Sequence, residues 1–172
     1  MKGTTEVIFY QNLVEASTYE ALFELAKALY KEKSWVCIPF KIEKDLSAKG
    51  KKYTKSPVGR WGQLVEGKVS VKEYWKEIEN SLPYNQVLTI TGIGLITGKT
   101  SQITILDVDD PKTFEETTGF KIQDLLKKTL AVRTINGGYH FYFKYNPEVK
   151  TGTYQHVGLD IRNDRALAVI PP

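Results

Sequence analysis

The stretch Ile103-Thr104-Ile105-Leu106-Asp107-Val108-Asp109-Asp110-Pro111 decides the fold class. Its apolar residues predict a strand over 103–108, and side chains two residues apart on a strand point to the same face. Asp107 and Asp109 therefore project together near the strand end, where two ionised carboxylates repel each other. A divalent cation relieves that repulsion, and hard oxygen ligands suit Mg²⁺ or Mn²⁺. A second interpretation stays open, in which Asp109-Asp110-Pro111 opens a turn and caps the next helix.

A histidine follows a pair of glycines downstream of this stretch. Asn136-Gly137-Gly138 is a strong turn signal between predicted strands over 131–135 and 139–145, and turns this tight favour antiparallel pairing. Glycine lets a ligand approach the backbone closely, and His140 can donate a hydrogen bond to a phosphate there. The alternative is a hairpin whose histidine only packs against the neighbouring strand.

A third carboxylate lies in an apolar strand near the end of the chain. In Gly158-Leu159-Asp160-Ile161-Arg162, Asp160 points away from the face of its two apolar neighbours. A lone carboxylate in such a strand costs free energy unless it is paired. One solution is a metal shared with the Asp107-x-Asp109 pair, and the other is an ion pair with Arg133 or Arg162. Because Arg162 shares the strand face of Asp160, it can also reach a phosphate in the same cleft.

Basic residues gather between residues 41 and 60, where seven Lys or Arg stand against two acidic residues. The segment is predicted as a loop, either solvated or close to the phosphates of a nucleotide or template. Within Lys55-Ser56-Pro57, the lysine is a candidate contact for a triphosphate, or a side chain that touches only water. His156 lies in a polar stretch and is expected on the surface.

Helical periodicity marks the first half of the chain. One helix is predicted over 17–31, and a second is predicted to end before Pro83. Each begins with a Ser-x-x-Glu capping box, at Ser17 and at Ser70. A short third helix is predicted over 121–128.

Strands dominate the second half. The predicted hairpin that closes the chain joins 158–162 to 166–170 through a short turn. Helices first and a mainly antiparallel sheet afterwards indicate an α+β domain. Apart from the segments named above, strands are expected at 35–40 with an end near Pro39, at 86–90 and at 94–97.

The chain has 172 residues, which suits one domain or two small lobes that share a core. The formal net charge of +4 and the pI near 9.0 are compatible with a phosphate-rich partner but do not identify one. Cys37 is the only cysteine, which excludes an intrachain disulfide and a Cys-rich zinc site. No apolar run reaches the about 18 residues of a membrane-spanning helix, and a cytoplasmic location is the expectation.

The ordered set of motifs resembles the primase-polymerase branch of the archaeo-eukaryotic primase superfamily. That branch has an apolar strand ending in DxD or DxE, a Gly-Gly-x-His-x-Tyr-Phe strand, a Gly-hydrophobic-Asp-hydrophobic-Arg strand and a closing Pro-Pro. The resemblance spans residues 17–172, and the matching motifs are Leu106-Asp107-Val108-Asp109, Gly137-Gly138-Tyr139-His140-Phe141-Tyr142-Phe143, Gly158-Leu159-Asp160-Ile161-Arg162 and Val169-Ile170-Pro171-Pro172.

This resemblance implies a DNA primase-polymerase that depends on two divalent ions, Mg²⁺ or Mn²⁺. It implies catalytic and metal-binding roles for three carboxylates, those of Asp107, Asp109 and Asp160. It also implies that His140 and Arg162 contact the phosphates of the incoming nucleotide, and Lys55 is carried as a further candidate for such a contact.

The family's fold packs a helix- and strand-containing N-terminal module on an RRM-like sheet, with the active site between them. We therefore expect a single catalytic domain over 1–172, with a helix-rich module over 1–85 and a sheet module over 86–172. The implied partners are a DNA template and primer, dNTPs or rNTPs, and a helicase or a C-terminal helical domain absent from this chain. The sequence departs from the family in Asn163-Asp164-Arg165-Ala166, where the family usually has glycines.

Two other functions fit parts of the pattern. A DxD glycosyltransferase shares the Asp-x-Asp pair, although the later strands with His140 and Asp160 argue against it. A non-catalytic RRM-like module would stack nucleic-acid bases on alternating exposed aromatics, here Tyr139, Phe141 and Phe143. We predict instead that these aromatics are core, and such a module has no need of three acidic groups that repel phosphates.

Overall fold

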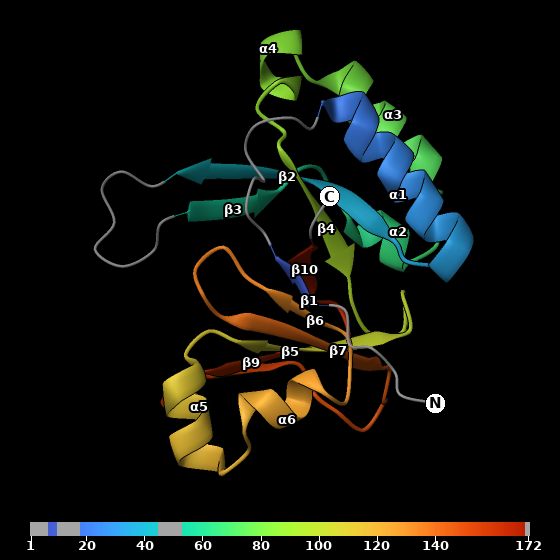
Figure 1. The fold of residues 1–172 in the computed structure, drawn as a ribbon. Coiled ribbons are helices and arrows are strands. Elements are labelled where there is room, and N and C mark those ends of the chain that lie inside the picture. The colour runs from blue at the N-terminus through green and yellow to red at the C-terminus, as the bar shows by residue number, and fades with distance from the viewer. Residues whose placement is uncertain (1–6, 10–17, 45–52, 171–172) are drawn as a thin grey trace. The chain divides into compact units, whose positions relative to one another are not determined.

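The computed structural model describes residues 7–9, 18–44 and 53–170, and its contacts divide the chain into two units (Figure 1). Unit 1 comprises residues 1–11 and 97–166, and unit 2 comprises residues 12–96 and 167–172. Each unit has a β-sheet of its own. The single catalytic domain expected over 1–172 stays a prediction.

Unit 2 is built on an antiparallel sheet in the order β10-β4-β2-β3. Its strands are β2 (Cys37–Lys44), β3 (Tyr53–Pro57), β4 (Gly92–Ile96) and β10 (Leu167–Ile170). Two helices pack against β2, namely α1 (Tyr19–Lys33) and α3 (Val71–Ser81). Two short helices precede and follow α3 in the chain, α2 (Gly62–Val65) and α4 (Tyr84–Val87).

Trp75 of α3 anchors the helices of unit 2 to the sheet. Its fully buried ring stacks on Phe23 of α1 with centroids 5.5 Å apart, and its indole N–H donates to the Cys37 carbonyl at 2.9 Å. Tyr19 of α1 donates its hydroxyl to the Trp75 carbonyl at 2.5 Å. Both helices were predicted from their apolar faces, and through these faces both pack against the same strand. Burial raises the pKa of the Cys37 thiol beneath them.

Both predicted helices of unit 2 form, but one cap differs from the prediction. Ser70 and Glu73 make the expected capping box of α3, and the Ser70 hydroxyl accepts from the Glu73 N–H at 3.2 Å. Helix α1 is capped instead by Thr18, whose side chain accepts from the Ala21 N–H at 3.2 Å. Ser17 lies outside the described residues.

Strand β2 continues through Pro39, so the strand end predicted there is wrong. The Pro39 carbonyl accepts from the Val58 N–H at 3.0 Å, one position past the end of the β2–β3 ladder. Proline has no N–H to donate. At Pro39 that N–H would point past the end of the β2–β3 ladder, so its absence breaks no regular hydrogen-bonded pair. The predicted loop over 41–60 is wrong in part, because residues 41–44 of β2 pair with residues 53–56 of β3. Residues 45–52 lie outside the described residues.

Unit 1 holds a six-stranded sheet in the order β1-β6-β7-β5-β9-β8. Strand β1 is parallel to β6, and the other neighbouring strands are antiparallel. The strands are β1 (Val7–Phe9), β5 (Ile103–Val108), β6 (Ala131–Arg133), β7 (Tyr139–Lys144), β8 (Gly152–Tyr154) and β9 (Leu159–Arg162). The helices are α5 (Pro111–Thr118), α6 (Ile122–Leu126) and the 3₁₀ helix η1 (Gln155–Val157).

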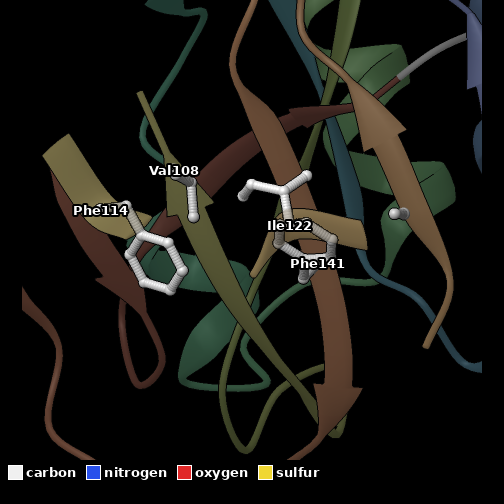
Figure 2. Packing of buried hydrophobic residues seen from close by; sticks show 5 residues of the cluster. Val108, Phe114, Ile122 and Phe141 are labelled. Atoms are coloured by element: carbon white, nitrogen blue, oxygen red, sulfur yellow. The ribbon is translucent and has the colours of Figure 1, made fainter. Parts of the chain in front are cut away.

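One face of this sheet packs against α5 and α6 (Figure 2). Val108 of β5 and Phe141 of β7 are fully buried in a cluster with Phe114 of α5 and Ile122 of α6. The flanking aromatics of β7 are partly buried against the same cluster. These aromatics are therefore core, as predicted, and they do not form an exposed stacking platform.

Two strand predictions are wrong. Residues 84–87 form α4 in place of the strand predicted over 86–90. Strands β9 and β10 do not pair as a hairpin, because β9 pairs with β5 and β8 whereas β10 pairs with β4. The turn at 163–166 therefore carries the chain from unit 1 into unit 2.

The described elements confirm the α+β class, with mainly antiparallel sheets and helices on their faces. Among the helices of the described ranges, none has the length and apolar character needed to cross a membrane.

Candidate metal centre

Three strands of unit 1 align the polar side chains that the sequence singled out. Asp107 lies opposite His140 in the β5–β7 ladder and opposite Asp160 in the β5–β9 ladder. Opposite residues share a face, so these side chains project from the side of the sheet away from α5 and α6. Asp109 stands two residues beyond Asp107 and continues that face past the end of β5.

The carboxylates of this face form a compact cluster. One oxygen from each of Asp107, Asp109 and Asp160 lies within 4.8 Å of the others. Asp107 is buried, Asp160 is half-buried and Asp109 is exposed, so the cluster opens toward solvent. Ionised carboxylates at this spacing repel one another, and hard oxygen donors are what Mg²⁺ and Mn²⁺ prefer. The donor set therefore fits divalent metal ions.

Arg162 lies beside two of the carboxylates. Its Nη2 is 2.6 Å from Asp160 Oδ2 and 3.4 Å from Asp107 Oδ2. The ion pair considered for Asp160 therefore forms with Arg162, and it coexists with the carboxylate cluster. Arg133 is no partner for Asp160, because it lies opposite Tyr139 on the other face of the sheet. The Arg162 guanidinium therefore offsets part of the negative charge of the carboxylates.

His140 is held against the cluster by Asp107. Its Nε2 lies 3.2 Å from Asp107 Oδ1, and its side chain is 5% exposed. Nδ1 is also buried, and it has no hydrogen-bond partner within the described part of the chain. Unpaired buried polar atoms of this kind are uncommon, and the Nε2 contact joins His140 to a carboxylate of the cluster in addition to its packing in the hairpin. Its predicted contact with a phosphate stays a prediction.

Gly138, in the turn before β7, lies in close contact with the end of β5. A Cβ on Gly138 would lie 2.4 Å from the Val108 carbonyl oxygen and 3.1 Å from Asp109 Cα. Gly137 has φ +93°, a conformation that suits glycine. The double glycine was expected to give a ligand access to the backbone. The neighbour that Gly138 admits is β5, and this close approach sets where Asp109 lies.

The capping interpretation of Asp109-Asp110-Pro111 is confirmed for Asp110, whereas metal binding by Asp107 and Asp109 stays a prediction. Asp110 caps α5, since its Oδ1 accepts from the Thr113 N–H at 3.1 Å and its Oδ2 from the Thr113 hydroxyl at 2.6 Å. The hydrogen bond from the Thr113 side chain is the main cause that holds the pKa of Asp110 below its usual range. Capping thus falls to Asp110, and the Asp107-x-Asp109 pair remains for the cluster.

Two predicted residues lie outside the cluster. Lys55 is exposed on β3 of unit 2, where it pairs in register with Ile42. Its contact with a triphosphate therefore stays a prediction. His156 is exposed in η1 of unit 1, as expected.

A family model described as bifunctional DNA primase/polymerase, N-terminal (Prim-Pol), matches residues 26–172. The chain belongs to the Prim-Pol family. No curated protein matches the chain. The range that matches Prim-Pol contains the carboxylate cluster, His140 and Arg162 as well as Lys55.

Membership in the Prim-Pol family implies an enzyme of the nucleotidyltransferase type that acts on DNA and nucleotides. Prim-Pol proteins depend on metal ions, and the carboxylate cluster is a suitable place for them. The family assignment argues against a glycosyltransferase, and the buried aromatics of β7 argue against an RRM-like binding module.

Proposed function

We propose that this Prim-Pol domain is a DNA-dependent primase-polymerase. It transfers nucleotidyl groups from dNTPs or rNTPs to a primer or an initiating nucleotide, and it uses two divalent ions. The cluster of Asp107, Asp109 and Asp160 carries the proposal, because its oxygens lie within 4.8 Å of one another in a Prim-Pol domain.

The three carboxylates hold the ions, which are Mg²⁺ or Mn²⁺. Bound ions of this kind acidify the primer 3′-hydroxyl and stabilise the negative charge of the pyrophosphate leaving group. The β5–β9 ladder holds Asp107 opposite Asp160, so these ligands need little reorganisation. The primer oxygen forms its bond to the α-phosphorus as the bond from phosphorus to pyrophosphate breaks.

Cationic and hydrogen-bonding side chains bind the triphosphate in this proposal. The Arg162 guanidinium has five N–H donors, and its Nη2 faces the carboxylates, so other donors remain for a phosphate. Asp107 orients the His140 imidazole through Nε2, and Nδ1 is the ring nitrogen left to meet a phosphate. Lys55 supplies a point charge from β3.

A primer-extension assay with labelled nucleotides and Mn²⁺ tests the proposal. Asp107→Asn is expected to reduce extension by at least about 10²–10³-fold, because an electrostatic stabiliser of the transition state is lost. Asp124→Asn, which changes an exposed acid on α6 that pairs with Lys127, is the matched control and should extend normally.

The outcomes separate the candidate functions. Extension lost in Asp107→Asn alone supports the polymerase. A second outcome is that the wild type binds nucleotide with metal but does not extend a primer, and that Asp107→Asn loses this binding. That outcome supports the metal and nucleotide site and shows that extension requires more than this chain. If the wild type shows neither extension nor metal-dependent nucleotide binding, the proposal is contradicted and a nucleic-acid-binding module is favoured.

A further inference from the structure

Asn163, the residue that follows Arg162 in the chain, is completely buried. Its Oδ1 accepts from the Thr104 hydroxyl at 2.7 Å, and its Nδ2 donates to the carbonyls of Asn146 and Val149. The acceptor and both N–H donors of this amide are therefore paired. A buried amide with all its partners stabilises one arrangement of the chain and penalises others.

The main chain of Asn163 is held as firmly as its side chain. Its N–H donates to Thr151 Oγ1 at 3.0 Å, and its carbonyl accepts from Thr97 Oγ1 at 2.6 Å. The segment between β7 and β8 and the entry to β5 are thereby tied to the end of β9.

The pair of Thr104 and Asn163 continues the β5–β9 ladder. The register that sets Asp160 opposite Asp107 brings Thr104 opposite Asn163, one position past the last ladder pair. Alternation along the strands puts this pair on the face opposite to the carboxylates. Thr104 is 4% exposed, so the hydrogen bond between the two side chains is shielded from water.

A slip of β9 along β5 would therefore be penalised twice. Movement by one residue would turn Asp160 and Arg162 to the apolar face. It would also separate Asn163 from Thr104 and leave a buried amide without partners. A single polar residue among apolar neighbours fixes the register of paired helices in the same manner.

We propose that Asn163 is a positioning residue, which locks the register of β9 and so holds Asp160 and Arg162 beside Asp107. The proposal rests on the metal-binding function proposed for the carboxylates. It adds a residue that touches neither the carboxylates nor any ion, and that acts only through the strand it ends.

Mn²⁺ binding to the full chain, followed by the electron paramagnetic resonance of free Mn²⁺, tests the proposal. Thr104→Val removes the donor to Asn163 and keeps the side-chain shape, Thr104→Ser keeps the hydroxyl, and Asn163→Ala removes the amide. Ile122→Val is the matched control, because it weakens the core of unit 1 on the helix side and leaves the ladder intact.

Thr104→Val and Asn163→Ala are expected to weaken Mn²⁺ binding by about tenfold, which is typical of residues that support metal ligands. Thr104→Ser should restore the wild-type affinity. Ile122→Val should lower the melting temperature and leave the affinity unchanged. If Asn163→Ala does not fold, the comparison of Thr104→Val with Thr104→Ser decides. Wild-type affinity in folded Thr104→Val would overturn the proposal.

Amide hydrogen exchange in the same variants separates this proposal from the proposed function. If the wild type binds no Mn²⁺, the metal-binding function fails, and exchange decides the register function alone. Faster exchange confined to β9 and its contacts with β5 and β8 in Thr104→Val supports the lock. Exchange that rises equally in β6 and β7 overturns it.

Discussion

At the end of β5, two neighbouring residues carry opposite kinds of side chain on the two faces of the strand. Asp107 belongs to the carboxylate cluster, whereas Val108, the next residue, is fully buried with Phe114. Removal of the apolar face from water stabilises unit 1, and the gathered negative charges of the other face oppose that stabilisation. Alternation thus places a stabilising core contact and the proposed metal site on one strand, where substitutions can affect them separately.

The largest difference between the effect on activity and the effect on stability is expected for a substitution on the carboxylate face. Asp160→Asn removes a proposed metal ligand, so Mn²⁺-dependent extension should fall by at least about 10²–10³-fold. The melting temperature should change little, because the repulsion relieved among the three carboxylates offsets the lost ion pair with Arg162, and the side-chain shape is kept. Extension assays and thermal melts of the same preparation check this, and an unfolded Asp160→Asn protein would contradict the separation of the two faces.

The opposite result is expected on the apolar face. Phe141→Ala removes a fully buried ring and should lower the free energy of unfolding by about 3–5 kcal/mol. Extension per folded molecule, measured well below the new melting temperature, should stay unchanged. Denaturant titration measures the loss, and Phe120→Ala, at a ring that is 62% exposed, is the control that should cost less than about 0.5 kcal/mol.

Gly138→Ala should affect stability and metal binding together. Gly138 touches the end of β5, where the buried Val108 and the carboxylate of Asp109 follow each other. Its Cβ would lie 2.4 Å from the Val108 carbonyl oxygen. The forced shift should cost about 1–3 kcal/mol of stability and should also weaken Mn²⁺ binding through Asp109. Gly62→Ala, where a Cβ meets nothing within 4 Å, is the control. Normal Mn²⁺ affinity in a destabilised Gly138→Ala protein would show that Asp109 does not depend on this approach.

The smallest effect is expected at the cap of α5, which is formed by Asp110, the residue after Asp109. The Thr113 hydrogen bonds hold the pKa of Asp110 below its usual value of about 3.9. Their stabilisation is therefore fully present above that value and is lost as the pH falls through the lower pKa of the folded state. Thr113→Val should lower the melting temperature slightly at pH 7, and this difference should shrink in acid.

Thr118→Val is the matched control for that pH dependence. Thr118 donates to the Phe114 carbonyl in the same helix, and no carboxylate takes part. Its effect on the melting temperature should therefore be the same at both pH values. A Thr113→Val effect that is equally independent of pH would contradict the account of the Asp110 cap.

Local patterns predicted the features that depend on local geometry. Alternation placed Asp107 and Asp160 on the faces they occupy, and the capping box at Ser70 follows from a short run of residues. Such signals need only the spacing of neighbouring side chains. The carboxylate cluster was therefore visible as two carboxylates on strands and a third just past a strand end, although the contact of Arg162 with two of them was one of several alternatives.

Pairing partners could not be predicted with the same success, because they depend on distant residues. The short turn after β9 has the composition of a hairpin turn, yet it leads to a strand of another sheet. Pro39 continues a strand because β3 ends beside it, which no signal near Pro39 reveals. Asn163 was placed only in that turn, and its departure from the family's glycines was the signal that could have marked it.

The pairing of β4 with β10 has a consequence for the order of folding. All of residues 97–166 lie between these two strands in the chain. Closing a loop of about 70 residues opposes their pairing while that segment is unfolded. Once unit 1 has folded, the Thr97 N–H and the Ala166 carbonyl are bonded at 2.9 Å, and the ends of the loop are already together. We therefore expect β10 to join its sheet late, and to leave it early when unit 1 unfolds.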